Sequence, residues 1–146
     1  MPKMQLDIVT AERLLVSEQV DYVSAPGIDG VLGILPRHAP LLTALAQGSL
    51  RYKKDGEEHE FAIGGGFMEV RPDRVTVLAD SAEHAEEIDE MRAEQARERA
   101  EQLLKEKPRT DPEAARVEQA LRRAEVRLKV ARRKRGGRRP LETGER

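Results

Sequence analysis

Residues 75–87 read VTVLADSAEHAEE, and the chemistry of the chain changes inside this stretch. Before Asp80 the sequence is rich in Val, Ile, Leu and Gly; after Ser81 it consists mainly of Ala, Glu, Arg and Lys, with no glycine before Gly136. The first set favours strands and the second favours helices. We therefore predict a β domain over residues 1–84, a two-helix region over residues 85–135, and a flexible basic tail over residues 136–146.

The β domain is predicted from alternation and turn signals. Met4, Leu6 and Ile8 alternate with polar residues and define one face of a strand. Asp55-Gly56 is a strong hairpin signal between two such segments. Further strands are expected over residues 13–16, 20–25, 41–46, 50–53, 60–63, 67–70 and 75–79, and a bulge or close backbone contact is expected at Gly64–Gly66. Many short strands at this spacing predict an antiparallel sandwich or barrel, and of these we expect an all-β sandwich.

Two helices are predicted to form an antiparallel α-helical hairpin. The first is expected from Ala82 to Glu106 with Asp80 or Ser81 as its cap, and the second begins at Thr110-Asp111-Pro112-Glu113 and ends at Gly136. Two apolar stripes follow helical spacing: Ala85, Ile88, Ala96, Ala100 and Leu103, and then Val117, Leu121, Ala124, Leu128 and Ala131. Alanine stripes bury little area, so a mobile switch arm and a permanently docked hairpin both remain open.

Composition excludes several classes of protein. The 146 residues include no Cys, no Trp, two Phe and two Tyr, which excludes disulfides, thiolate catalysis and Cys-ligated zinc and argues against a base-stacking surface. The three histidines are isolated, without metal-ligand spacing, and no Walker A or Gly-x-Ser-x-Gly sequence occurs. No apolar run approaches the ~18 residues of a membrane span, and no signal peptide is recognised. We expect an intracellular, water-soluble protein that is not an enzyme.

Charge is distributed unevenly along the chain. Residues 1–80 carry net charge −4, residues 81–106 carry −5, and residues 107–146 carry +8. The basic end, residues 132–135 with Arg138 and Arg139, supports an alternative function as a nucleic-acid or acidic-surface binding protein. The acidic first domain and the scarcity of aromatic residues argue against nucleic acid as a partner.

Three segments resemble the epsilon subunit of the bacterial rotary (F-type) ATP synthase. Residues 30–43 read GVLGILPRHAPLLT, similar to the family pattern G-x-x-G-I-x-P-x-H-x-P-L-L-T, and residues 65–70 (GGFMEV) and 75–80 (VTVLAD) also match. The resemblance implies a non-catalytic central-stalk subunit at the cytoplasmic face of the plasma membrane, peripheral and without direct membrane insertion. It implies the gamma subunit, the c-ring and the catalytic head as partners, with an extended hairpin that inhibits ATP hydrolysis.

The resemblance also implies a rotor interface in the β domain. In the family, the loop that corresponds to Gly27–Gly33 faces the c-ring. Some members have an acidic residue at the position of Val31, which Asp29 could replace here. The segment with Pro36, His38 and Pro40 is expected to be a rigid loop of the same interface, because two prolines restrict the backbone.

The hairpin resembles family members that bind ATP as a regulatory ligand. Residues 88–93 read IDEMRA, which matches the family motif I/L-D-x-x-R-A, and residues 120–124 read ALRRA. The residues implied for the ATP site are Glu83, Ile88, Asp89, Arg92, Arg99, Arg123 and Arg127. Converging guanidinium groups suit a triphosphate, whereas the simpler alternative is ion pairing between the two helices. No metal and no required cofactor is expected, and ATP would not be hydrolysed.

Overall fold

A computed structural model describes residues 2–135 of the chain, so the basic tail predicted over residues 136–146 lies outside the described residues. Within the described part, eight strands precede the helices. They are β1 (Met4–Val9), β2 (Leu14–Val20), β3 (Tyr22–Gly27), β4 (Gly30–Ile34), β5 (Leu41–Lys54), β6 (Glu57–Val70), β7 (Arg74–Ala79) and β8 (Ala82–His84). Their arrangement confirms the predicted β-sandwich.

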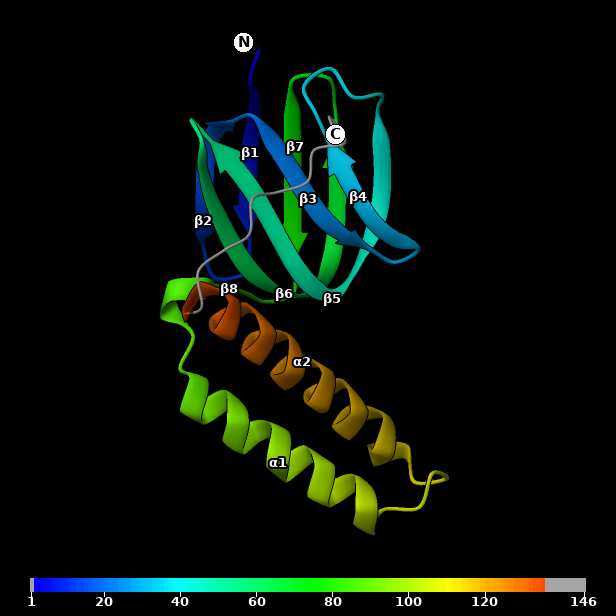
Figure 1. The fold of residues 1–146 in the computed structure, drawn as a ribbon. Coiled ribbons are helices and arrows are strands. Elements are labelled where there is room, and N and C mark those ends of the chain that lie inside the picture. The colour runs from blue at the N-terminus through cyan, green and yellow to red at the C-terminus, as the bar shows by residue number, and fades with distance from the viewer. Residues whose placement is uncertain (1, 136–146) are drawn as a thin grey trace.

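The two layers of the sandwich arise from one sheet that folds over itself (Figure 1). The strand order is β2-β1-β7-β6-β5-β3-β4, with β8 paired to β6 outside this path. β7 pairs with residues 66–70 of β6, whereas β3 pairs mainly with residues 51–53 of β5. The long strands β5 and β6 therefore contribute to both layers and enclose the core.

Alternating apolar residues fill that core as the sequence predicts. Met4, Leu6 and Ile8 are at most 1% exposed, and Val75 and Val77 on the neighbouring β7 are completely buried. Because successive strand residues point to opposite faces, one apolar face per strand suffices to define the interior.

Three strand predictions need correction. Residues 41–54 form one 14-residue strand and not two. Gly48 does not mark a turn; its missing side chain allows Pro26 of β3 to approach, since a Cβ at Gly48 would lie 2.7 Å from the Pro26 Cβ. Residues 57–70 are likewise one strand. Residues 27–33 are not a loop but the β3–β4 hairpin, in which Gly27 pairs with Gly30 around a tight turn.

The glycine run in β6 confirms the close backbone contact expected there. Gly66 has a φ of 136°, and a Cβ at this residue would clash with the carbonyl oxygen of Leu78 on β7. Only glycine fits this combination of backbone angle and strand approach.

The predicted start of the first helix is wrong. Residues 82–84 form β8, which pairs with residues 61–63 of β6, and a 3-10 turn η1 (Ala85–Glu87) follows. Helix α1 (Glu90–Glu106) begins only after Asp89, whose side chain accepts a hydrogen bond from the Arg92 backbone N–H at 3.1 Å. Long-range strand pairing thus overrides the helix propensity of Ala and Glu at residues 82–84.

Helix α2 (Pro112–Arg135) begins as predicted, with the Asp111 side chain accepting from the Glu113 backbone N–H at 2.9 Å. The two helices are joined by the short segment 107–111 and form the predicted antiparallel hairpin, with α2 against β5 and β6 and α1 on the outer side of α2 (Figure 1). The end of the hairpin that contains the link projects away from the sandwich.

The apolar stripe of α1 differs from the prediction. Ala96 is exposed, whereas Ala93 and Ala100 are buried and Arg97 lies half-buried between them. The Arg97 stem packs within the stripe while its guanidinium reaches carboxylates, so a charged residue occupies a position that the sequence pattern assigns to an apolar one.

The predicted stripe of α2 is confirmed, with Ala124, Leu128 and Ala131 buried. A second face of α2 covers the sandwich: Val130 is completely buried and clusters with Ala62 of β6 and Ala85 of η1, with Ile88 and Val126 packed beside them. This interface between the hairpin and the sandwich has few apolar residues.

Candidate functional site

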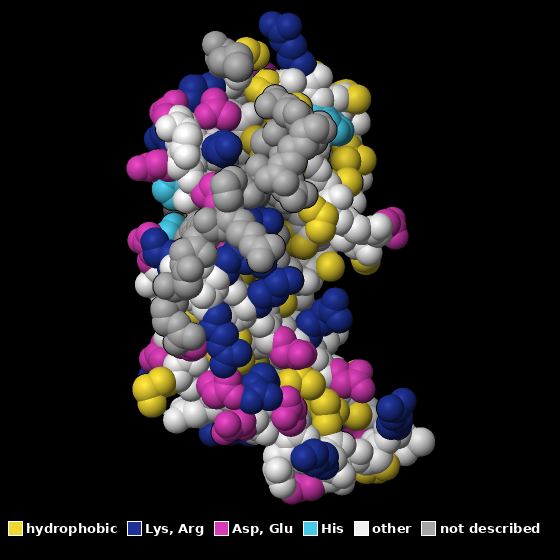
Figure 2. Space-filling view, viewed as in Figure 1, with side chains coloured by type: hydrophobic (Ala, Val, Ile, Leu, Met, Phe, Trp, Pro, Cys, Tyr) yellow, Lys and Arg dark blue, Asp and Glu magenta, His cyan; other side chains and the backbone are white. Residues whose placement is uncertain are grey.

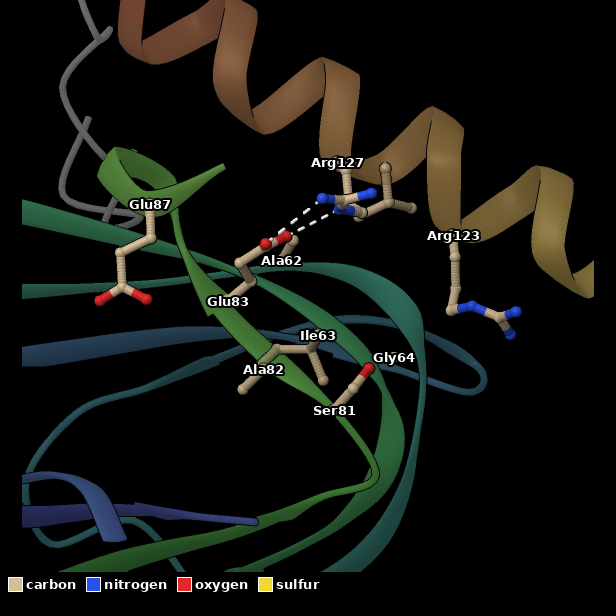
Figure 3. Close-up of a pocket in the computed structure, with 10 residues that line it drawn as sticks. Ala62, Ile63, Gly64, Ser81, Ala82, Glu83, Glu87, Arg123 and Arg127 are labelled. Atoms are coloured by element: carbon tan, nitrogen blue, oxygen red, sulfur yellow. Dashed lines mark hydrogen bonds and ion pairs between the residues drawn. The ribbon is translucent and has the colours of Figure 1, made fainter. Parts of the chain in front are cut away.

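A pocket of about 410 Å³ opens between the sandwich and α2 (Figure 3). Its strand side is formed by residues 62–64 of β6 and residues 81–83 around β8, and Glu87 of η1 closes one end. Arg123, Val126 and Arg127 of α2 form the opposite side. The volume lies within the range of small-molecule sites, and the pocket has two carboxylates and two guanidinium groups on its walls.

The two arginines of the pocket differ in their contacts. Arg127 makes two hydrogen bonds to Glu83, from Nε to Oε1 at 2.7 Å and from Nη2 to Oε2 at 3.3 Å. Arg123 is exposed and forms no ion pair with any residue that the structure describes; Figure 3 shows its side chain pointing from α2 toward the strand side. Arg123 is therefore a cation available to an anionic ligand.

The remaining residues predicted for ATP lie elsewhere. Ile88 packs in the small apolar cluster beneath α2. Asp89 caps α1, and Arg92, with an 81% exposed side chain, has its Nε 4.0 Å from Asp89 Oδ2. Arg99 is exposed on α1. The structure thus brings Glu83, Arg123 and Arg127 together at the pocket and leaves Asp89, Arg92 and Arg99 outside its lining.

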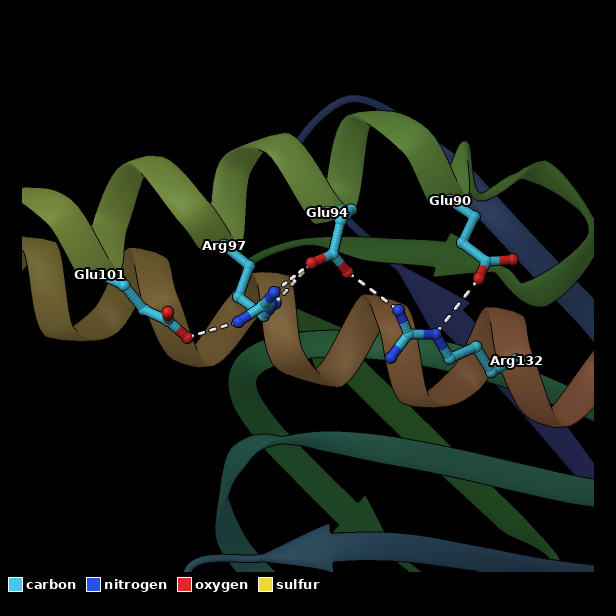
Figure 4. A network of polar contacts seen from close by, with 5 residues as sticks. All are labelled: Glu90, Glu94, Arg97, Glu101 and Arg132. Atoms are coloured by element: carbon cyan, nitrogen blue, oxygen red, sulfur yellow. Dashed lines mark hydrogen bonds and ion pairs between the residues drawn. The ribbon is translucent and has the colours of Figure 1, made fainter.

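Ion pairs join the two helices near the sandwich (Figure 4). Arg132 of α2 bonds Glu90 at 3.2 Å and Glu94 at 2.9 Å on α1. On α1 itself, Arg97 pairs with Glu94 and, at 2.5 Å, with Glu101. The hydrogen bond from Arg97 is the largest cause that lowers the pKa of Glu94. This network matches the simpler interpretation of the helix charges as inter-helix pairing.

The basic end of α2 is engaged inside the molecule. Arg133 bonds Glu60 of β6 at 2.7 Å, and Lys134 bonds Glu86 of η1 at 2.9 Å. In Figure 2, basic and acidic side chains are interspersed over the hairpin and do not form a field of one sign. Such a surface gives little support to nucleic-acid binding, which favours clustered positive charge.

An apolar row crosses the outer face of one layer of the sandwich, and the sequence analysis missed it. Residues paired in register across β5, β6, β7, β1 and β2 are Ala44, Phe67, Leu78, Val9 and Leu14. Phe67, Leu78 and Leu14 are 55–58% exposed. The signal that could have found them is apolar residues on both faces of strands whose opposite face fills the core.

The turn between β3 and β4 extends this apolar surface. The Ile28 backbone N–H donates to the carbonyl of Ala44 at 3.1 Å, which places the turn beside one end of the row. Ile28 and Val31 are 63% and 77% exposed, and Asp29 lies exposed in the turn. Figure 2 shows hydrophobic side chains along the edge of the sandwich where β4 lies.

The predicted loop around Pro36, His38 and Pro40 joins β4 to β5. The His38 ring Nδ1 lies 2.7 Å from the Ala39 carbonyl oxygen, and the Arg37 backbone N–H donates to the Pro72 carbonyl at 2.7 Å. The loop is thus tied to the β6–β7 turn, consistent with a structural role for His38.

Family comparison covers nearly the whole described chain. Residues 3–85 match the model of the ATP synthase delta/epsilon chain β-sandwich domain, and residues 86–132 match that of the delta/epsilon chain long α-helix domain. The chain belongs to the ATP synthase delta/epsilon family. The resemblance to epsilon subunits is confirmed.

Epsilon chains of several bacteria are close relatives. The ATP synthase epsilon chain of Herpetosiphon aurantiacus is 61% identical over 128 residues, which cover 88% of this chain and 93% of the relative. That of Dehalococcoides mccartyi is 58% identical over 135 residues, covering 92% and 96%. The relatives therefore extend across both the sandwich and the hairpin.

Solved structures of ATP synthases contain the same fold. One such structure holds OSCP, F1 and the c-ring of the Euglena gracilis mitochondrial ATP synthase. A chain in it superposes on this chain with a TM-score of 0.76 and 25% sequence identity, and the match covers 86% of this chain and 79% of that chain. A chain of the Tetrahymena thermophila enzyme, from a structure of the central stalk and c-ring, has a TM-score of 0.60 at 14% identity over 88% and 96%, which shows the fold alone.

The pocket lies across the junction of the two epsilon-family domains. Glu83 belongs to the part matched by the sandwich model, and Arg123 and Arg127 belong to the part matched by the helix model. Consequently the pocket exists only while the hairpin is docked on the sandwich. In the described residues, no group of three or more His, Asp or Glu side chains is arranged to hold a metal ion. Neither helix of this part has the length and apolarity needed to span a bilayer.

Proposed function

We propose that this chain is a non-catalytic central-stalk subunit of the proton-translocating ATP synthase, bound peripherally at the cytoplasmic face of the plasma membrane. Its family membership supports this function, as does the presence of F1 and the c-ring in the assembly that holds its Euglena relative. In this role it couples the c-ring and gamma to the catalytic head and regulates ATP hydrolysis through its hairpin.

The exposed apolar row on the sandwich is the observation that carries the docking part of the proposal. A continuous row with Phe67 and Leu78 more than half exposed is costly in water and suits a permanent protein partner. We assign this row to gamma, and the β3–β4 turn with Ile28, Asp29 and Val31 to the c-ring. The loop with Pro36, His38 and Pro40, at the other end of β4, would be a rigid part of the same rotor interface.

The regulatory part of the proposal rests on how the hairpin is held. Few apolar residues are buried between it and the sandwich, and ion pairs such as Arg127–Glu83 and Lys134–Glu86 join the two. Such an interface allows a second, extended arrangement of the arm along gamma, in which the helices contact the catalytic head and inhibit ATP hydrolysis.

ATP as a regulatory ligand is supported by the pocket. An anion bound there would meet the exposed Arg123 directly and would compete with Glu83 for Arg127. Because the pocket requires the docked hairpin, bound ATP would favour the compact arm by mass action. Ile88 would contribute through its packing beneath α2, whereas Asp89, Arg92 and Arg99 would have to move to contact the ligand.

Reconstitution separates the two parts of the proposed function. The full chain and a fragment of residues 1–84, which keeps all strands through His84, are each added to an ATP synthase that lacks its own epsilon chain. We expect both to bind gamma and only the full chain to slow ATP hydrolysis. A folded fragment that fails to bind would refute sandwich docking, and a fragment that inhibits as strongly as the full chain would refute the role of the hairpin.

A further inference from the structure

Glu60 is a carboxylate in an unusual place. It lies on β6 and is completely buried, the one charged residue among the buried side chains of the described chain. Its neighbours Phe61 and Ile63 face the core of the sandwich, so Glu60 and Ala62 lie on the opposite face, the part covered by the docked α2. Isolated buried carboxylates are strongly unfavourable, and this one therefore needs a partner.

Two groups bond Glu60, and one of them comes from the hairpin. The Ser49 hydroxyl of β5 donates to Glu60 Oε2 at 2.5 Å, and Nη1 of Arg133 donates to the same oxygen at 2.7 Å. The other oxygen, Oε1, is buried without a hydrogen-bond partner among the described residues. The Arg133 side chain is 22% exposed, so the pair is largely removed from solvent.

The other ion pairs at this end of α2 are more exposed. Lys134 and Glu86 have side chains 43% and 60% exposed, and exposed pairs of this kind contribute little to stability. Arg51 of β5 lies directly opposite Glu60 in the β5–β6 register, yet the cation that bonds the carboxylate is Arg133. The charge of Glu60 is therefore matched by a residue 73 positions away, on the hairpin.

We propose that Glu60 and Arg133 form a latch that holds the hairpin in its compact position. The proposal deepens the regulatory part of the proposed function, and rests on it for the meaning of hairpin release. Docking places Arg133 on a carboxylate that the docked helix itself buries. Any partly docked arm that covers Glu60 without seating Arg133 leaves a buried charge unpaired, so the latch makes docking specific for one position of α2.

A thiol introduced under α2 measures how often the hairpin opens. The chain has no cysteine, and Ala85 of η1, which is 3% exposed, packs with Val130 of α2 and lies outside the pocket lining, can be replaced in the full chain by Ala85→Cys. When closing is faster than labelling, the rate of modification by an aryl disulfide reports the fraction of open molecules. Arg133→Met keeps most of the apolar stem and removes the charge, and Lys134→Met is the matched control one residue away.

Removing one partner of a buried ion pair strongly destabilises the docked hairpin, whereas removing one partner of an exposed ion pair destabilises it only slightly. We expect Arg133→Met to raise the labelling rate of the introduced thiol about a hundredfold. Lys134→Met should raise it by no more than about fivefold. Equal rates in the two variants would overturn the latch, and would mean that Arg51 neutralises Glu60 without help from the hairpin.

A second variant separates charge pairing from simple packing of the Arg133 stem. Glu60→Gln keeps a hydrogen bond with Ser49 and removes the buried charge, so adding it to Arg133→Met should slow labelling again relative to Arg133→Met alone. Labelling that stays as fast in the double variant would also overturn the proposal. These readouts use the isolated chain and do not depend on inhibition of ATP hydrolysis, so failure of the latch and failure of the proposed function are distinguishable.

Discussion

The apolar row on the sandwich gives the most direct test of docking, through Phe67→Ala. Phe67 lies on β6 between Ala44 and Leu78 of the row and is 57% exposed. A buried aromatic side chain removes roughly 200 Å² from water, so a partner can cover about 115 Å² more of Phe67. At about 25 cal/mol per Å², that area corresponds to about 3 kcal/mol, or a loss of affinity of about a hundredfold. Area alone overestimates affinity, so the figure is an upper value.

Calorimetric titration of a gamma-containing ATP synthase that lacks its epsilon chain measures this loss. Two controls bracket this loss. Glu69→Ala changes a polar residue on the same strand but outside the row, and Met91→Ala changes a 75% exposed apolar residue on α1. Both should bind gamma within about threefold of the unmodified chain, since neither removes area from the row. A Phe67→Ala chain that binds as tightly as these controls, with an unchanged Tm, would refute the assignment of the row to gamma.

Three further outcomes follow from the structure. Arg123→Ala should weaken ATP binding about tenfold or more, whereas Arg99→Ala, a change outside the pocket, should leave the affinity unchanged. Calorimetric titration with ATP measures both, and equal losses of affinity would argue against the pocket. Gly66→Ala should lower the free energy of unfolding by about 3 kcal/mol or more, measured in urea, because its Cβ meets a carbonyl of β7; an unchanged midpoint would contradict this. The pKa of Glu94 lies below its ordinary value of 4.5, chiefly because Arg97 donates a hydrogen bond to its carboxylate. The ionised carboxylate therefore stabilises the hairpin at neutral pH, and this stabilisation disappears as the pH falls through the lowered pKa. Glu94→Gln should reduce the loss of ellipticity on acidification, and an acid transition identical to that of the unmodified chain would contradict this.

Local signals in the sequence were sufficient for most of the fold. Alternation at Met4, Leu6 and Ile8, the Asp55-Gly56 turn and the start of α2 within residues 110–113 each depend on neighbouring residues, and all appear in the structure as predicted. The errors occur where contacts between residues far apart in the sequence determine the secondary structure. Residues 82–84 have helix propensity but pair with β6, and residues 47–49 resemble a turn but continue the ladder of β5. No local pattern contains that information.

The residues of the candidate site were likewise predicted from the sequence only in part. The resemblance led to Glu83 and Arg127, which the docked hairpin joins across 44 residues of sequence. It also led to Asp89 and Arg92, whose observed contacts are those of a helix cap, a local role that any Asp before a helix can fill. Glu60 could not have been found, because a Glu in an alternating strand is expected to face solvent until a helix is known to cover it.

The balance of forces at the hairpin suits the proposed switch, in which one interface both holds and releases the arm. A large apolar interface would fix the helices permanently, whereas the cluster beneath α2 buries only Ala62, Ala85 and Val130 among the residues that the structure describes. Exposed pairs such as Lys134 with Glu86 contribute at most about 1 kcal/mol each and are screened by salt. A difference in binding free energy of about 5.5 kcal/mol is enough to invert a two-state equilibrium from 1:99 to 99:1. Because the other contacts of the hairpin contribute so little, a single buried ion pair or a bound anion is able to decide the position of the arm. In the proposed switch, specific charge matching at Glu60 and at the pocket therefore controls the hairpin more effectively than its alanine stripes.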